Sequence, residues 1–225
     1  MDIFHKLWEN IYCLVVLGKH EASMEQYIDT LTSIDDEQQL LDFCRKKILH
    51  GTPFIFKDRE DEYYEFRKKI ANEFNIDFHN VLITGSGKLG FSPYKLKKFD
   101  MDSDIDVAIV SSKLYDEIMV SIFRYQRELR ENRIKVSDSE IDRYHRFLEY
   151  GALGWMRPDL LPLSFNIKDL KDKWFDFFDS LSYGRSEVGN YKVAAGAFKS
   201  YWHLENYTMM GLTKLKNKYK VKEVS

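Results

Sequence analysis

Two aspartates with one residue between them, Asp104 and Asp106, open an apolar run that continues to Val110. The β-branched residues of this run predict a buried strand. Because side chains alternate between the two faces of a strand, both carboxylates point the same way. Like charges held together in this manner repel each other unless a cation lies between them. The pattern therefore predicts a divalent metal site with oxygen ligands, typically magnesium, with manganese as an alternative.

A glycine-rich turn precedes the acids in the chain. Residues 81–83 form a short apolar run, predicted to be a strand, and Gly85, Ser86, Gly87 and Lys88 follow it. A turn of this kind brings backbone N–H groups against a phosphate. The Ser86 hydroxyl is a further phosphate contact, and Lys88 is expected to act on phosphate as a point charge. If the two strands pair, the turn lies beside the carboxylates, which predicts a metal–nucleotide site on a mixed sheet.

Gly85-Ser86 at a strand end, followed by Asp104-Ile-Asp106 opening the next strand, resembles the signature of the DNA polymerase β-like nucleotidyltransferase superfamily. The wider sequence from Gly85 to Val110 resembles small bacterial nucleotidyltransferase-like proteins, and the likeness covers roughly positions 80–115. It implies a transferase that moves a nucleoside monophosphate from an NTP, such as ATP, to a hydroxyl group and releases pyrophosphate. Asp104 and Asp106 would then be the catalytic magnesium ligands. Gly85, Ser86, Gly87 and Lys88 would bind the nucleotide.

The acceptor of the nucleotide is left open by the sequence. A nucleotide, a nucleic-acid end, a protein side chain and a small molecule are all compatible with it. The net charge of −2 provides no global basic field that would indicate nucleic acid.

The chain departs from this superfamily in one respect. Active members carry a third carboxylate on a later strand, but no apolar–acid–apolar strand is evident after position 112; the remaining candidates are Asp159, Glu187 and Glu205. A non-catalytic nucleotide sensor or interaction protein on the same fold is therefore the alternative, including a component of a bacterial defence or toxin–antitoxin system. A third acid near Asp104 and Asp106 would favour the enzyme. An apolar or basic residue there would favour the sensor.

Two other motifs are excluded by the residues at positions that they require. A P-loop would need glycine at position 82 and Ser or Thr after Lys88, where Leu82 and Leu89 stand. An EF-hand loop starting at Asp100 would need glycine and glutamate where Ile105 and Ser111 stand.

Composition indicates an intracellular globular protein. The 225 residues are 44% hydrophobic, enough for a substantial core. Cys13 and Cys44 lie in predicted helices far from the motif, which favours a reduced compartment. No signal peptide or membrane span is evident, so we expect a cytoplasmic protein with no membrane partner.

The predicted fold class is α/β (α+β), with a small mixed sheet carrying the motif, surrounding helices and a mainly helical C-terminal half. Residues 1–75 are predicted to be an N-terminal helical segment packed on the core, 76–190 the nucleotidyltransferase core and 191–225 a C-terminal helical segment. Amphipathic spacing predicts helices at 2–18, 23–32, 35–49, 59–74, 114–133, 138–148 and 169–182, and from 201 onward. Extended segments are expected at 54–56 and 163–167, whereas 191–198 fits a strand or the start of a helix.

Overall fold

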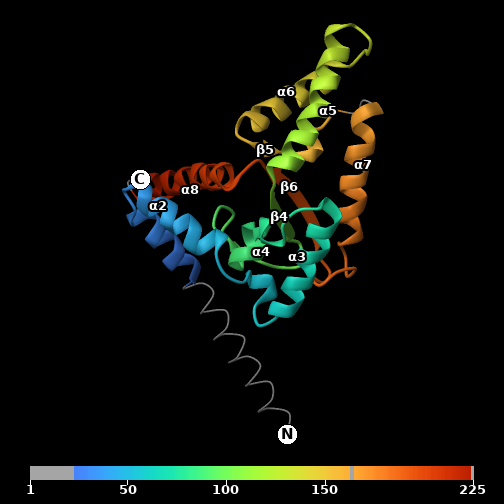
Figure 1. The fold of residues 1–225 in the computed structure, drawn as a ribbon. Coiled ribbons are helices and arrows are strands. Elements are labelled where there is room, and N and C mark those ends of the chain that lie inside the picture. The colour runs from blue at the N-terminus through green and yellow to red at the C-terminus, as the bar shows by residue number, and fades with distance from the viewer. Residues whose placement is uncertain (1–22, 163–164, 224–225) are drawn as a thin grey trace.

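A four-stranded mixed sheet lies at the centre of the computed structural model, which describes residues 23–162 and 165–223 (Figure 1). Its strand order is β1-β4-β6-β5. β1 (Val81–Thr84) is antiparallel to β4 (Asp104–Val110), and β4 is parallel to β6 (Lys192–Phe198). β5 (Trp155–Met156) is antiparallel to β6. A small separate hairpin joins β2 (Phe91–Ser92) to β3 (Lys97–Lys98).

Helices make up most of the remaining described chain, so the predicted mixed-sheet α+β fold with a largely helical C-terminal half is confirmed. Residues 23–33 are helical. The other helices are α2 (Glu37–Cys44), α3 (Glu60–Phe74), α4 (Gly85–Leu89), α5 (Ser112–Arg130), α6 (Asp138–Ala152), α7 (Phe165–Ser180) and α8 (Tyr201–Glu223), with short π or 3-10 turns at Arg45–Leu49, Phe54–Phe56, Phe78–Asn80 and Pro158–Leu160. Within the described ranges, no helix is long and apolar enough to cross a membrane.

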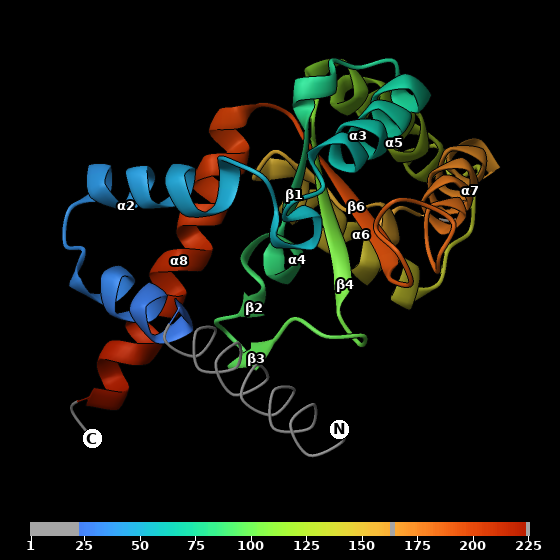
Figure 2. The same ribbon diagram turned by 90° about the horizontal axis from the view of Figure 1, so that it is seen from below.

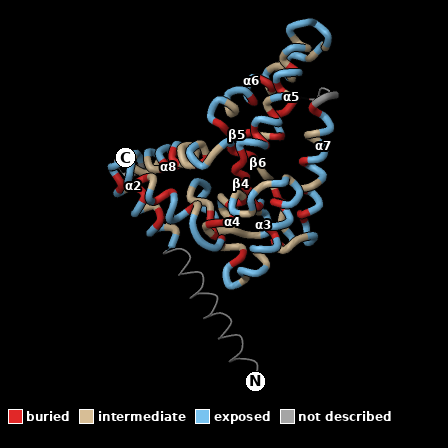
Figure 3. Tube along the Cα trace, in the orientation of Figure 1, coloured by how far each residue is buried: buried red, intermediate tan, exposed pale blue. Residues whose placement is uncertain are grey.

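The alternation of β4 divides its side chains between two hydrophobic layers. Ile105, Val107 and Ile109 belong to the larger core, which α3, α5, α6 and α7 cover. Ala108 and Val110 face the opposite side, where they pack with Phe198 and with Leu204 of α8. Figure 3 shows the buried strands between these helices. Asp104 and Asp106 therefore lie on the α8 side of the sheet.

A helical arm, formed by residues 23–33, α2 and α8, extends away from the rest of the helices (Figures 1 and 2). It has a hydrophobic core of its own, in which Leu31 and Cys44 are fully buried. α8 connects the arm to the sheet, because its first turns pack on Val110 and Phe198 while its later turns pack on α2. The arm thus forms a wall beside the face that carries the two aspartates.

Several local expectations differ from the structure. Residues 165–167 belong to α7 rather than to a strand, and Phe54–Phe56 is a 3-10 turn rather than an extended piece. The ambiguous segment 191–198 contains β6, so the C-terminal segment begins with a strand of the central sheet. The predicted helix at 2–18 lies outside the described residues.

Candidate nucleotide and metal site

The two halves of the motif meet because β1 and β4 are neighbours. Thr84, the last residue of β1, pairs with Asp106 near the start of β4. Gly85 follows Thr84 with a positive φ of 63°, and a Cβ built on it would overlap Oδ2 of Asp106. This backbone conformation and this contact both require glycine. The turn and the carboxylate are therefore in direct contact, as the sequence predicted.

Asp104 and Asp106 lie on the same face of β4, and both residues are exposed. Asp106 lies at the base of a cavity, and this partial desolvation raises the pKa of its carboxyl to about 6. The charge of Asp104 raises this pKa further, whereas Lys95 lowers it. The pair of carboxylates consequently carries negative charge that a bound cation would neutralise.

Ser86 and Gly87 occupy the first turn of α4, and each has a distinct role. Ser86 lines the cavity beside Asp106. Gly87 is buried, and a Cβ there would lie 3.2 Å from Cδ1 of Ile105, so the absent side chain lets α4 pack closely on the sheet. Gly87 thus supports the turn from behind rather than lining the cavity.

Lys88 does not point toward the cavity. It is buried, and its Nζ donates hydrogen bonds to the backbone oxygens of His50 and Gly51, the latter at 2.7 Å. These bonds fasten α4 to the segment that follows α2. The structure therefore separates Lys88 from the other predicted nucleotide-binding residues and gives it a structural contact instead.

A cavity of about 850 Å³ opens beside the motif, and it is lined by the sheet, by the helical arm and by residues of α7 that include Trp174 and Asp179. Its floor near Asp106 consists of small residues, Ala108, Ala194 and Gly196. One wall is a stripe of α8 at helical spacing, formed by Leu204, Tyr207, Thr208, Gly211, Leu212 and Leu215. The volume is within the range typical of small-molecule sites and would hold a nucleotide.

The end of the cavity away from the aspartates is aromatic. Trp155 stacks on Phe198 with ring centroids 5.7 Å apart and contacts Tyr207 at 4.4 Å. A Cβ on Gly196 would lie 2.5 Å from Nε1 of Trp155, so this glycine makes room for the indole across the sheet. Arg157 lies over the rings of Tyr150 and Trp155.

The loop between β2 and β3 brings Lys95 toward Asp106. α8 holds this loop, because the hydroxyl of Tyr219 donates to the oxygen of Pro93 at 2.7 Å and Nζ of Lys218 lies 4.1 Å from the ring centre of Tyr94. The basic end of α8 thus has structural contacts with this loop. Lys97, at the end of the same loop, instead pairs with Asp100 at 2.8 Å.

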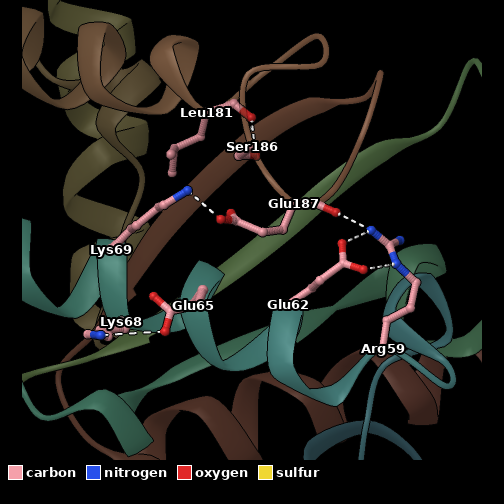
Figure 4. A network of polar contacts seen from close by, with 8 residues as sticks. All are labelled: Arg59, Glu62, Glu65, Lys68, Lys69, Leu181, Ser186 and Glu187. Atoms are coloured by element: carbon pink, nitrogen blue, oxygen red, sulfur yellow. Dashed lines mark hydrogen bonds and ion pairs between the residues drawn. The ribbon is translucent and has the colours of Figure 1, made fainter.

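None of the three candidate third carboxylates joins the pair. Asp159 forms a bidentate contact with Arg157, at 3.2 and 2.7 Å. Glu205 binds Arg45 in a similar manner, at 2.6 and 3.0 Å. Glu187 pairs with Lys69, while Arg59 donates to its backbone oxygen at 2.8 Å (Figure 4). Each acid therefore has a local structural partner.

On the neighbouring strand β6, the positions beside the two aspartates are occupied by residues that are not acids. In the register of β4 and β6, Asp104 pairs with Lys192 and Asp106 with Ala194. Throughout the described ranges, no group of three His, Cys, Asp or Glu residues could hold a metal ion. The protein thus offers two carboxylates, which fits a magnesium ion that takes its other ligands from phosphate and water rather than a closed protein cage.

Lys192 and the small-residue floor of β6 are the part of the site that sequence reasoning missed. The only available signal was that the segment 191–198 was compatible with a strand.

Comparisons of the chain with protein-family models, with curated proteins and with solved structures gave no match.

Proposed function

We propose that the chain is a magnesium-dependent nucleotidyltransferase that binds an NTP in the cavity between the sheet and α8. The observation that carries the proposal is the contact between the Gly85-Ser86 turn and Asp106, with Asp104 on the same face. A triphosphate beside this turn would accept hydrogen bonds from backbone N–H groups and from the Ser86 hydroxyl. The nucleoside would extend over Ala194 and Gly196 toward the aromatic end of the cavity.

Asp104 and Asp106 would hold the magnesium ion, which would neutralise the triphosphate and make pyrophosphate a better leaving group. In the reaction, an acceptor oxygen forms a bond to the α-phosphorus, and the bond from that phosphorus to the bridging oxygen of the β-phosphate breaks. Pyrophosphate leaves, and the hydroxyl proton is released. The residues of this chain would position the two reactants and exclude part of the solvent, which accounts for much of the catalysis in phosphoryl transfer.

A second candidate function is nucleotide binding without transfer. The register favours it, because Lys192 and Ala194 stand opposite the aspartates where a third carboxylate would complete the site. Without that acid, the described residues provide no third carboxylate beside the pair that would bind a second metal ion. The two candidates share the nucleotide site and differ only in the chemistry that follows binding.

Incubation of the full chain with each labelled NTP and magnesium tests both functions. We expect pyrophosphate release that is lost in the Asp104→Ala/Asp106→Ala double variant, and the preferred base would then narrow the acceptor. Saturable NTP binding without turnover, with manganese and several acceptors also tried, would support the second candidate. If the protein binds no NTP, both functions are rejected.

A further inference from the structure

Lys192 lies on the same face of the sheet as Asp104. It is the first residue of β6, and its Cα pairs with that of Asp104 across two parallel strands. Residues paired in this way project to the same side, and the strands are about 4.8 Å apart. Val193, the next residue, is 2% exposed in the core on the opposite face. The direction of Lys192 is therefore set by the register and by the burial of its neighbour.

The ammonium group of Lys192 is available to a ligand. The residue is exposed and lines the same cavity as Ser86 and Asp106. In the part of the chain that the structure describes, its side chain makes no hydrogen bond or ion pair. Lys199, just after the other end of β6, differs, because its Nζ lies 3.8 Å from Asp116 and 5.2 Å from the ring centre of Tyr115.

We propose that Lys192 binds the phosphates of the nucleotide and supplies the positive charge that a second metal ion would otherwise bring. The proposal rests on the proposed function, because it concerns the same nucleotide site. A lysine in place of a carboxylate changes the local charge by two units, which equals the charge of one magnesium ion. The site would then bind its ligand with one metal ion, held by Asp104 and Asp106.

The residues around Lys192 are consistent with this role. Ala194, two positions along the same face, belongs to the cavity floor, and its small side chain leaves space beside the lysine. Lys95, in the loop between β2 and β3, is close enough to Asp106 for its charge to lower the pKa of that carboxyl. A triphosphate bound at the aspartates would have this second cation near it, which helps to compensate for the charge of the two carboxylates.

Equilibrium binding of non-hydrolysable analogues of the four NTPs, in magnesium, tests the role of Lys192 in the full chain. Lys192→Ala should weaken binding of the preferred analogue roughly ten- to a hundredfold, as expected when a charge-assisted hydrogen bond is lost. Binding of the matching nucleoside, which lacks phosphates, should be unchanged. The matched control is Lys199→Ala, which removes an exposed lysine that lies just beyond the other end of β6 and should leave the affinity for the analogue within about twofold.

The number of bound metal ions distinguishes a site with Lys192 and one metal ion from a site with two metal ions. Manganese titration followed by electron paramagnetic resonance should show one tightly bound ion in the wild-type complex with the analogue. Lys192→Asp, which restores a carboxylate at this place, should show two. Thermal unfolding of each variant checks that it is folded.

The outcomes distinguish this inference from the function on which it rests. If the wild-type chain binds no NTP analogue, the proposed function and the role of Lys192 are both rejected. If it binds the analogue but Lys192→Ala binds equally well, or if the wild-type complex holds two manganese ions, only the role of Lys192 is overturned.

Discussion

Gly85 lies so close to Asp106 that a single added carbon atom would overlap the carboxylate oxygen Oδ2. The contact links the end of β1 to the start of β4, and it arises from the pairing of Thr84 with Asp106. Because Gly85 also has a φ of 63°, two independent constraints act on this one position. The glycine of the motif is therefore needed for the position of Asp106, the proposed metal ligand.

Gly85→Ala should reduce NTP affinity at least about tenfold, because the new methyl group would displace Asp106, and a left-handed alanine costs roughly 1–2 kcal/mol of stability. Isothermal titration calorimetry and denaturant unfolding measure the two effects. Gly184→Ala is the matched control, because Gly184 has a φ of 80° but no atom within 4 Å of the added carbon. If the two variants lose the same stability and neither loses affinity, the contact with Asp106 has no role in binding.

Asp106→Asn should stabilise the free protein at pH 7 and lack the stabilisation that we expect magnesium–NTP to give the wild type. The reason is that desolvation and the charge of Asp104 raise the pKa of Asp106, so its ionised form opposes folding. Because the site is open to solvent, we expect a gain of no more than about 1 kcal/mol in the free energy of unfolding. Urea unfolding with and without magnesium and nucleotide measures both effects.

Asp102→Asn is the control for that experiment, because the side chain of Asp102 is 89% exposed and its carboxylate lies 3.8 Å from Lys97. It should keep the ligand-induced stabilisation. A loss of stability in Asp106→Asn without ligand would contradict the expected repulsion between the two carboxylates.

Lys88→Met should remove part of the pH dependence of the free energy of unfolding. Burial lowers the pKa of Lys88 to about 8 from its usual value of 10.5. Between these two values the unfolded chain binds more protons than the folded one, so this lysine makes the free energy of unfolding rise with pH from about 8 to about 10. The variant should lack that rise. It should also be less stable at pH 7 by about 1–3 kcal/mol, because the oxygens of His50 and Gly51 lose their donor.

Unfolding by urea at several pH values, with the exposed Lys57→Met as control, measures this dependence. The difference between the wild type and Lys88→Met should widen above pH 8, while the difference for Lys57→Met should stay constant. A constant difference for Lys88→Met would show that its pKa is not lowered by the fold.

The local part of the site was predictable from sequence because it depends on strand periodicity and on glycine. The spacing of Asp104 and Asp106 placed both carboxylates on one face, and the turn after residue 83 placed Gly85 beside them. The direction of Lys88 was not predictable, since α4 is a single short turn whose orientation depends on its packing against the segment after α2.

The neighbour of the aspartates on β6 was also beyond sequence reasoning. The segment Lys192–Phe198 contains three alanines, which favour a helix, and one glycine, which favours neither helix nor strand, so its composition does not predict a strand. Its conformation depends on pairing with β4, whose partner residues lie 88 positions earlier in the chain. A pattern of one acid between apolar residues therefore does not identify Lys192 as the neighbour of Asp104.

Gly211 offers a test of whether the ligand lies against α8. It is in the middle of this helix, it lines the cavity, and a Cβ built on it meets no atom within 4 Å. Glycine inside a helix costs about 1 kcal/mol relative to alanine, so Gly211→Ala should raise the free energy of unfolding by about that amount.

Gly211→Trp should fill the cavity beside Tyr207 and Thr208 and weaken nucleotide binding at least about tenfold, since a well-packed ligand has no room to move aside. Met210→Trp, at the adjacent exposed position outside the cavity lining, is the matched control and should bind as the wild type does. Equal affinity of both tryptophan variants for the NTP analogue would place the ligand away from α8.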